Sequence, residues 1–319
     1  MYKAILEKIE KYNSIVIFGH LNPDGDCYGS QMAFRKSLKL KYPDKHIYAV
    51  GSGLHRFFDI LGKMDVVSEK VIEQSLAIIV DGNDLPRMED QRVNFASDFV
   101  KFDHHLDIGS FTEGPSLVDE DASSCCEILL DFFRNNNFPI DQEVAQCLLL
   151  GFITDTGRFQ FVNDYPKIFK DVSFLCEMGA DPDSLNTILN MSSEHSAIFK
   201  GYVYTHYQKT ENGVLYLYFN KRTLKKYRMN ANAASGLVNL LSNIRGCPIW
   251  MFMCENNNST IHIEFRSYGP MVQPVAVKYG GGGHAHAAGT TIEKYDQDVI
   301  DSMLKDLDDL AKKWKEENE

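Results

Sequence analysis

Acidic and imidazole side chains recur in this sequence directly after apolar segments. Four clusters contain them: His20 with Asp24 and Asp26; Asp81; Asp103 with His104 and His105; and Asp155. In open α/β sheets, ligands bind beyond the carboxyl ends of the strands, so we expect these groups to meet at one sheet edge. Carboxylates gathered there would repel one another strongly without cations. The pattern therefore predicts a site for two divalent metal ions.

Carboxylate oxygens combined with imidazole nitrogens suit manganese best, and magnesium, cobalt and zinc are also compatible. A structural zinc site would offer more cysteines and fewer acids. Taken one at a time, the same clusters also fit structural roles: a turn at residues 24–26, helix caps at Asp81 and Asp103, and surface or core positions for His104 and His105. Their combination favours the metal site, because buried acids are rarely unpaired.

The first half of the chain must position these clusters by alternating strands and helices. Short apolar runs rich in β-formers predict strands over residues 15–18, 76–80 and 99–102, and helical patterns cover 31–40, 128–134 and 144–153. Ser124 and Glu127 form a capping-box pattern that opens the second of these helices. This order predicts βαβ units with a mainly parallel sheet.

The second half predicts another α/β unit. A helical stretch over 192–208 comes first; strands are predicted over 214–219, 249–254 and 261–266, and helices over 231–244 and 296–317. The predicted fold class is therefore α/β with two domains. An N-terminal domain with a mainly parallel sheet and flanking helices spans 1–190, a helical linker spans 191–212, and a smaller C-terminal α/β domain with a mixed sheet spans 213–319.

The composition limits the class of protein and its partners. The net charge of -11 opposes tight binding to long duplex nucleic acid, although a local cationic site can still bind a short anion. No run approaches the roughly 20 apolar residues that span a bilayer, and the N-terminus lacks the continuous apolar region of a secretory signal. Seven cysteines without a C-x-x-C pair are typical of reduced core thiols. A cytoplasmic protein without membrane partners is expected.

The motifs resemble, in order and spacing, those of the DHH phosphoesterase family. The matching segments are His20-x-x-Pro-Asp24-Gly-Asp26, Asp81, Asp103-His104-His105 and Thr154-Asp155-Thr156-Gly157-x-Phe159. The run Gly280–His284, continuing to Gly289, resembles the glycine-rich signature of the DHH-associated C-terminal domain. Size and layout are most similar to nanoRNase/pAp phosphatases, and also to cyclic-dinucleotide phosphodiesterases. One departure is the segment 82–87 after Asp81, which keeps the metal ligand but alters local substrate contacts.

The resemblance implies a role for each site residue. His20 and Asp24 would hold one metal, Asp26, His104 and Asp155 the other, and Asp81 would bridge both. Metals about 4 Å apart can activate a shared water and aim it at phosphorus. Asp103 would orient a ligand histidine, and His105 would face the phosphate as a hydrogen-bond donor or leaving-group acid. A purely structural donor role for His105 is the alternative.

The second domain offers candidates for substrate binding. They are Arg266, Ser267, Gly282, Gly283 and His284, whose guanidinium and backbone amides would bind a terminal phosphate or base. A flexible hairpin is the alternative for the glycines, and a surface salt bridge for Arg266. The basic run 221–228 would steer an anionic substrate, with Tyr227 stacking on a base, or would simply form a solvated helix face.

The resulting hypothesis is a phosphodiesterase that degrades RNAs of two to five nucleotides, and linear dinucleotides such as pApA or pGpG, to mononucleotides. Removal of the 3′-phosphate from pAp is the expected second activity. The alternatives are a cyclic di-AMP phosphodiesterase, a pyrophosphate or polyphosphate hydrolase, and a catalytically silent nucleotide-binding module. The sequence leaves a homodimer open.

Overall fold

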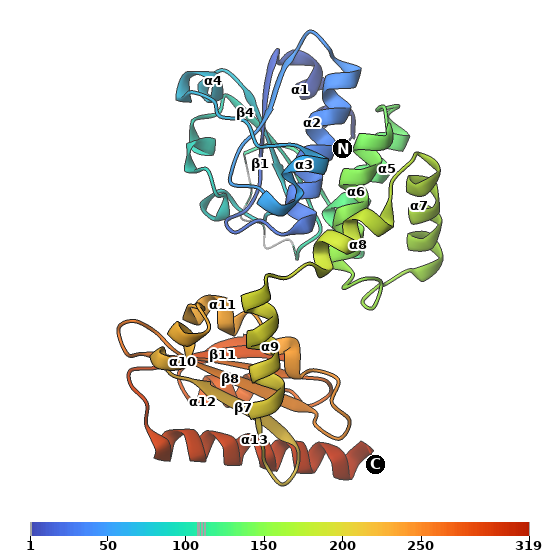
Figure 1. Cartoon of the computed structure of the whole chain (residues 1–319). Helices are drawn as coiled ribbons and strands as arrows, with labels where there is room; N and C mark the ends of the chain where they lie inside the picture. The colour runs from blue at the N-terminus through green and yellow to red at the C-terminus, as the bar shows by residue number, and fades with distance from the viewer. Residues whose placement is uncertain (1, 107–108, 110, 112, 319) are drawn as a thin grey trace. The chain divides into compact units, whose positions relative to one another are not determined.

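The helices and strands divide between two compact units, Met1–Met191 and Ser192–Glu319. The computed structural model in Figure 1 describes residues 2–106, 109, 111 and 113–318. Helix α9 (Glu194–His206) belongs to the second unit, where Phe199 and Val203 are fully buried. The linker role of residues 191–212 stays a prediction.

The first unit is built on a parallel sheet. Within the described residues its strand order is β2-β1-β3-β4-β5, and every neighbouring pair is parallel, as predicted. The strands are β1 (Ser14–Phe18), β2 (His46–Ala49), β3 (Leu76–Val80), β4 (Asp98–Asp103) and β5 (Ser116–Val118). The central strands β1 and β3 are almost wholly buried, because helices and loops cover both faces of a parallel sheet.

Helices of the first unit place the acidic clusters. They are α1 (Tyr2–Lys11), α2 (Gly25–Lys41), α3 (Phe58–Leu61), α4 (Glu69–Glu73), α5 (Cys125–Asn135), α6 (Gln142–Asp155), α7 (Tyr165–Glu177) and α8 (Pro182–Asn190). Helix α2 begins six residues earlier than the predicted start at Gln31, because the Asp24 side chain caps it. Ser124 caps α5 by accepting a hydrogen bond from the backbone N–H of Glu127, as its sequence pattern predicts.

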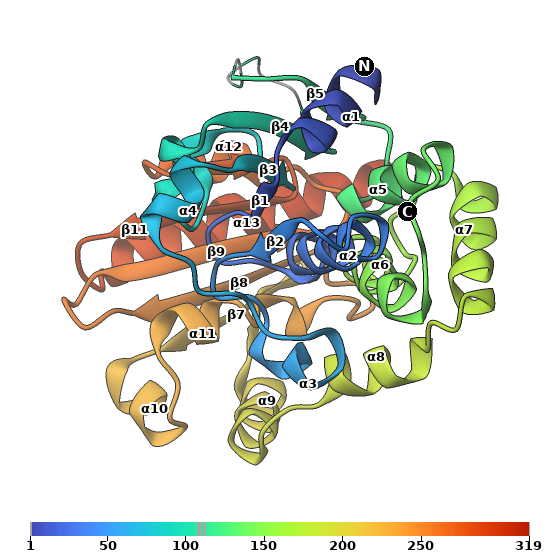
Figure 2. The ribbon, with the colours of Figure 1, turned by 90° about the horizontal axis from the view of Figure 1, so that it is seen from above.

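Helices α2 and α6 lie side by side and pack unusually closely (Figures 1 and 2). A Cβ atom on Gly29 of α2 would lie 2.5 Å from the carbonyl oxygen of Cys147 in α6. A Cβ atom on Gly25 would lie 2.4 Å from the Thr154 side chain. Glycine at these positions therefore lets the two helices approach, which brings their N- and C-terminal acids together.

The second unit contains a mixed sheet. Its order among the described residues is β10-β11-β9-β8-β7-β6, with β7 and β8 parallel and the other pairs antiparallel. The strands are β6 (Gln208–Lys209), β7 (Val214–Phe219), β8 (Ile249–Glu255), β9 (Ile261–Ser267), β10 (Gly282–His284) and β11 (Ala287–Ile292). The mixed sheet predicted for this half is confirmed.

Helices cover this sheet from two sides (Figure 1). Besides α9 they are α10 (Lys221–Lys226), α11 (Ala231–Ser235), α12 (Gln273–Lys278) and α13 (Gln297–Asn318). The single helix predicted over residues 231–244 is wrong, since α11 ends at Ser235 with Gly236 as its C-cap, and a separate 3-10 turn covers Val238–Leu241. Glycine is a poor helix former, by about 1 kcal/mol relative to alanine, which favours this break.

The described helices include none that is both long and apolar enough to cross a membrane. The cytoplasmic location stays a prediction.

Candidate active site

Asp81 occupies the centre of the polar cluster at the carboxyl end of β3. Its backbone is left-handed, with φ of 56°, and its side chain is buried. The Nε2 atoms of His20 and His104 lie 3.4 Å from its two different oxygens, and Nδ1 of His105 lies 3.6 Å from the oxygen that faces His104. Asp81 therefore stands between imidazoles from two loops, in a strained conformation typical of functional positions.

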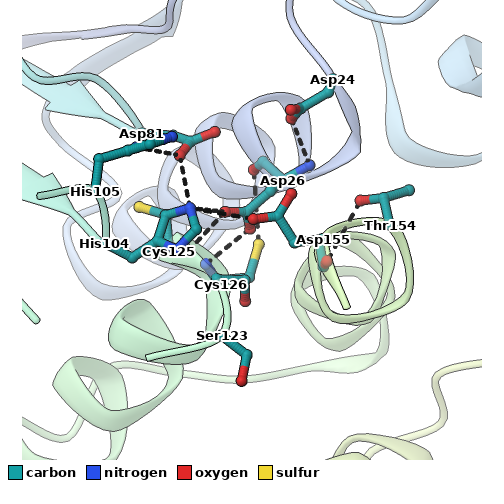
Figure 3. Close-up of polar contacts among 12 residues, drawn as sticks. Asp24, Asp26, Asp81, His104, His105, Ser123, Cys125, Cys126, Thr154 and Asp155 are labelled. Atoms are coloured by element: carbon teal, nitrogen blue, oxygen red, sulfur yellow. Dashed lines mark hydrogen bonds and ion pairs between the residues drawn. The ribbon is translucent and has the colours of Figure 1, made fainter. Parts of the chain in front are cut away.

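Asp26 is fully buried in the first turn of α2. It accepts hydrogen bonds from the backbone N–H groups of Cys125 (2.6 Å) and Cys126 (2.9 Å) at the N-terminus of α5. Beside it, Nε2 of His104 lies 3.9 Å from an Asp26 oxygen and 3.1 Å from an Asp155 oxygen (Figure 3). Three predicted site residues, from the start of α2, the end of α6 and the loop after β4, thus lie close together.

Asp24 and His20 form the other side of the cluster. One Asp24 oxygen caps α2 by accepting from Asp26 N and Cys27 N, both at 3.0 Å. The other oxygen lies 3.9 Å from Nε2 of His20. The opposite ring nitrogen of His20 lies 3.0 Å from the Leu21 carbonyl oxygen, a contact that turns Nε2 towards the cluster. One oxygen of Asp24 therefore caps α2, and the other is left to face the cluster, where it could bind a metal ion.

Asp103 holds His105 rather than His104. Its Oδ1 lies 2.8 Å from Nδ1 of His105 and also accepts the His105 backbone N–H at 3.2 Å. On the other side, Nζ of the buried Lys101 lies 3.8 Å from Oδ2 of Asp103. This anchoring leaves the His105 side chain about half exposed, with 48% of its surface accessible.

The charges in the cluster shift several pKa values. Contacts with Asp81 raise the pKa of His20 to about 9. Burial lowers the pKa of His104, but Asp155 and Asp81 outweigh it and raise the value to about 11. Burial raises the pKa of Asp26, and the charges of Asp81 and Asp155 add to this effect. Protons on the imidazoles therefore offset the carboxylate charge when no metal is bound.

The donor set fits divalent metal ions. Among the described residues three groups bring their ligand atoms within 4.8 Å of one another: His20, Cys27 and Asp81; Asp81, His104 and His105; and Asp26, His104 and Asp155. One oxygen of Asp81 is buried without a hydrogen-bond partner in the part of the chain that the structure describes. A cation would satisfy that oxygen, since buried carboxylates need pairing or coordination.

Sequence reasoning missed two features of this cluster. The first is the pair of backbone amides from Cys125 and Cys126, which the capping-box pattern at Ser124 could have indicated because it marks a helix N-terminus. The second is Cys27, whose thiol lies in the group with His20 and Asp81. Burial raises the pKa of Cys27 well above its ordinary value, so the thiol stays neutral and is a poor ligand for hard cations.

The candidates in the second unit lie on β9 and β10. The strand register places Arg266 opposite Ala287, which in turn pairs with His284, so the two polar side chains share one face of the sheet. Glu264 contacts Arg266 at 2.5 Å and His262 at 2.9 Å. Burial alone would raise the pKa of Glu264, but His262 and Arg266 hold it below its usual value. The guanidinium is therefore held in place along β9.

The remaining candidates differ in what surrounds them. Ser267 alternates to the face opposite Arg266, and its hydroxyl donates to the Pro270 carbonyl at 2.5 Å. A Cβ atom on Gly283 would lie 2.6 Å from the carbonyl oxygen of Ala287, so the hairpin itself requires this glycine. A Cβ atom on Gly282 would meet nothing within 4 Å. Local packing therefore does not require a glycine at position 282, which borders open space.

A parallel sheet that gathers carboxylates and imidazoles at one edge, followed by a mixed-sheet unit, is the arrangement of a phosphoesterase, an enzyme of the hydrolase class. The chain belongs to the DHH family. The model of the DHH family N-terminal domain matches residues 14–152, and the DHHA1 domain model matches residues 211–313. The resemblance predicted from the motifs is thereby confirmed.

Relatives match the chain over nearly its whole length. It is 32% identical to the bifunctional oligoribonuclease and PAP phosphatase NrnA of Bacillus subtilis (strain 168), covering 98% of this chain and 99% of that protein. It is 33% identical to the protein of the same name from Mycoplasma genitalium, covering 95% and 96%. The structure of an exopolyphosphatase-related protein from Bacteroides fragilis superposes with a TM-score of 0.82 at 24% identity, covering 97% and 96%, and shows the shared fold.

Proposed function

We propose that this chain is a two-metal phosphodiesterase that hydrolyses RNAs of two to five nucleotides to mononucleotides and removes the 3′-phosphate from pAp. The observation that carries the proposal is the convergence of Asp26, Asp81, Asp155, His20 and His104 around buried carboxylate oxygens. The substrate class is supported by relatives named oligoribonuclease and PAP phosphatase over nearly full length.

The distances support a division of the ligands between two metal sites. His20 and Asp24 would serve one site, and Asp26, His104 and Asp155 the other. Asp81 would serve both, because its two oxygens face His20 and His104 respectively, each at 3.4 Å. Manganese is the favoured ion for this mixture of oxygen and nitrogen donors. Two such ions, when bound, would supply Lewis-acid charge at the scissile phosphate.

His105 is the proposed proton donor to the leaving oxygen. Asp103 fixes its Nδ1 at 2.8 Å and raises its pKa, which favours the protonated ring that a proton donor needs, and the side chain is about half exposed to a substrate. Replacing His105 with asparagine should lower kcat by about 10²–10⁴-fold, the usual contribution of a general acid. Manganese affinity and Tm should change little, whereas a purely structural role would lower Tm together with kcat.

Arg266, Ser267, Gly282, Gly283 and His284 are the proposed contacts to the substrate. The shared face of Arg266 and His284 and the open space at Gly282 support this assignment. A guanidinium suits a phosphate because it donates two parallel hydrogen bonds. Ser267 and Gly283 would support substrate binding indirectly, by holding the shape of the hairpin and its neighbouring turn.

Hydrolysis of several phosphate esters under identical conditions tests the proposal. With manganese, pApA, a 24-nucleotide RNA, pAp, cyclic di-AMP and pyrophosphate are compared in parallel. We expect pApA and pAp to be hydrolysed fastest, and Asp81→Asn to abolish turnover of both while the protein stays folded. Faster cleavage of cyclic di-AMP would reassign the substrate, and activity retained by the Asp81→Asn variant would overturn the two-metal mechanism.

A further inference from the structure

The loop that joins α6 to α7 in the first unit contains a left-handed turn just after Asp155 (Figure 1). Gly157, Arg158 and Phe159 follow one another with φ of 56°, 61° and 65°. Residues with a Cβ atom rarely adopt this conformation, and for a bulky residue such as Phe159 it is a genuine outlier. Strain of this kind persists only where the surrounding structure holds it, and it is concentrated at functional sites. The turn therefore calls for a functional explanation.

Thr156 holds this turn in place. Its fully buried side chain accepts a hydrogen bond from the backbone N–H of Phe159 at 2.8 Å and donates to the carbonyl oxygen of Phe152 at 2.5 Å. Its own carbonyl oxygen accepts the backbone N–H of Phe161 at 2.9 Å. The chain thus returns to the residue that directly follows Asp155, so Phe161 and this proposed metal ligand belong to one tightly hydrogen-bonded turn.

The two phenylalanines of this loop have different environments. Phe159 packs against the larger core of the first unit, and its ring centroid lies 5.7 Å from that of Phe169. Phe161 is 72% exposed, and none of the aromatic contacts within the described residues involves it. A Cβ atom on Gly157 would lie 2.8 Å from the Phe161 ring, so the ring lies directly against the bare backbone of this glycine. The turn thus presents an aromatic ring to solvent at a defined place.

Space for a ligand adjoins the turn. A hollow of about 250 Å³ is lined by Ile153, Thr154, Gly157, Arg158 and Leu189. Gly157 thus borders both the hollow and the Phe161 ring, while Thr154 directly precedes Asp155 in the sequence. The Arg158 guanidinium is anchored, since it donates to Oδ1 of Asn190 at 2.7 Å. The hollow, the exposed ring and a proposed metal ligand therefore belong to the same short segment.

A nucleobase is the occupant that suits this ring. A single exposed phenylalanine needs no explanation by itself, whereas one that a strained turn presents beside Asp155 does. The proposed metal site at Asp155 would hold a phosphate, and the nucleoside attached to that phosphate carries a planar base. Aromatic side chains stack on any base, because every base has a π-face.

We propose that Phe161 is a stacking platform for a base of the substrate whose phosphate is bound beside Asp155. This inference rests on the proposed function and assigns the base contact of that same site. Stacking detects the presence of a base and tolerates its identity, so the contact favours nucleotides over phosphate esters that lack a base.

The test compares Phe161 with Phe169, an exposed phenylalanine of α7 whose ring is paired with those of Phe159 and Tyr165 at 5.7 and 6.0 Å. Binding of labelled pApA and of the same dinucleotide without its bases is measured by fluorescence anisotropy with manganese. The full chain is used, in a His105→Asn background that slows cleavage. Phe161→Leu, which keeps an apolar side chain but removes the ring, should lower the affinity for pApA about tenfold and leave that for the base-free ligand unchanged. Phe169→Leu should change neither affinity.

Phe161→Trp provides a second readout that reports the contact itself. This variant should bind pApA at least as tightly as the wild type, and pApA should quench the emission of the introduced indole, whereas the base-free ligand should not. The unsubstituted chain gives the background from Trp250 and Trp314. Because the side chain at position 161 is exposed, Tm should not fall in either variant, so a lost affinity does not come from unfolding.

Equal effects of Phe161→Leu on the two ligands, or emission of Phe161→Trp that pApA does not quench, would overturn the platform. Hydrolysis of pApA by a chain whose affinity for it is insensitive to Phe161→Leu would refute the platform and keep the proposed activity. Binding of pApA through Phe161 by a chain that cleaves none of the substrates would do the reverse.

Discussion

The position of Asp26 illustrates how the fold orients one residue of the proposed metal site. Its carboxylate lies at the N-terminus of α5, where the amides of Cys125 and Cys126 donate to it and the helix dipole favours negative charge. These amides fix the orientation of both oxygens before any cation arrives. A carboxylate held in this way loses little side-chain entropy on coordination, which favours affinity.

Gly282 allows a sharp test of substrate contact at the level of one residue. Because a Cβ atom there would meet nothing within 4 Å, Gly282→Ala should leave Tm unchanged. The added methyl group would occupy the open space that we assign to the substrate, so KM for pApA should rise about tenfold or more. Steady-state kinetics and thermal unfolding of the same preparations measure both quantities.

The adjacent Gly283 is the matched comparison. With φ of 128° and a Cβ atom that would lie 2.6 Å from the Ala287 carbonyl oxygen, Gly283→Ala should lower Tm. An unchanged KM in Gly282→Ala would remove this position from the substrate site.

At the scale of elements, the contact of α2 with α6 determines the geometry of the site. Gly151 of α6 faces Asp26, and a Cβ atom on it would lie 2.3 Å from Asp26 Oδ1 and 2.4 Å from Cys126 Sγ. Gly151→Ala should therefore force the helices apart. We expect a destabilisation of about 1–3 kcal/mol and a fall in kcat of about 10²-fold, because displaced ligands misalign the reacting groups. Urea unfolding and kcat with manganese measure the two effects.

Gly201 in α9 is the control for that substitution, since a Cβ atom there would meet nothing within 4 Å. Gly201→Ala should stabilise the chain by about 0.5–1 kcal/mol, because alanine is the better helix former. Wild-type kcat in Gly151→Ala would show that the close approach of α2 and α6 is not needed for catalysis.

Elements with continuous apolar runs were predictable from the sequence, and those without them were not. Strands β1 and β3 were predicted because they are buried on both faces. Strand β2 alternates exposed and buried residues over four positions, and β5 spans three half-buried positions, so neither has a distinctive pattern. The residues that meet in the acidic and imidazole cluster were predictable from residue type and spacing. The capping box at Ser124 marks the helix N-terminus that carries the amides of α5, but their pairing with Asp26 was not predictable, because that contact joins residues about one hundred positions apart in the sequence.

At the scale of the whole molecule, each unit has its own hydrophobic core. Two apolar clusters lie in the first unit, the larger of which contains Phe34, Phe102 and Phe132, and two others lie in the second unit. Separate cores imply separate unfolding transitions, so the Tm that each substitution changes is that of the unit that contains it. The effects of metal should appear in the transition of the first unit, because the predicted ligands all belong to it.

The stability of the metal-free first unit should fall as pH rises. The folded-state pKa of His20 is raised to about 9 and that of His104 to about 11, so the stabilisation they provide is complete below the unfolded value of 6.5 and is lost as pH rises through the folded values. The raised pKa values of Asp24 and Asp26 act in the same direction, since these acids resist ionisation in the fold. In EDTA, the Tm of the first unit should fall from pH 6.5 to 7.5 and again to 8.5, as measured by thermal unfolding.

Manganese should reverse that trend. At the proposed ligands His20 and His104, metal binding would displace the ring protons, so its stabilising effect should grow as pH rises. His20→Gln should reduce the pH dependence in EDTA, whereas the same change at His46, which is exposed at the start of β2, should not. If the Tm of the first unit in EDTA stayed constant or rose between pH 6.5 and 8.5, the charge balance described for this site would be contradicted. A manganese effect independent of pH would show that the protons and the metal do not compete for the same atoms.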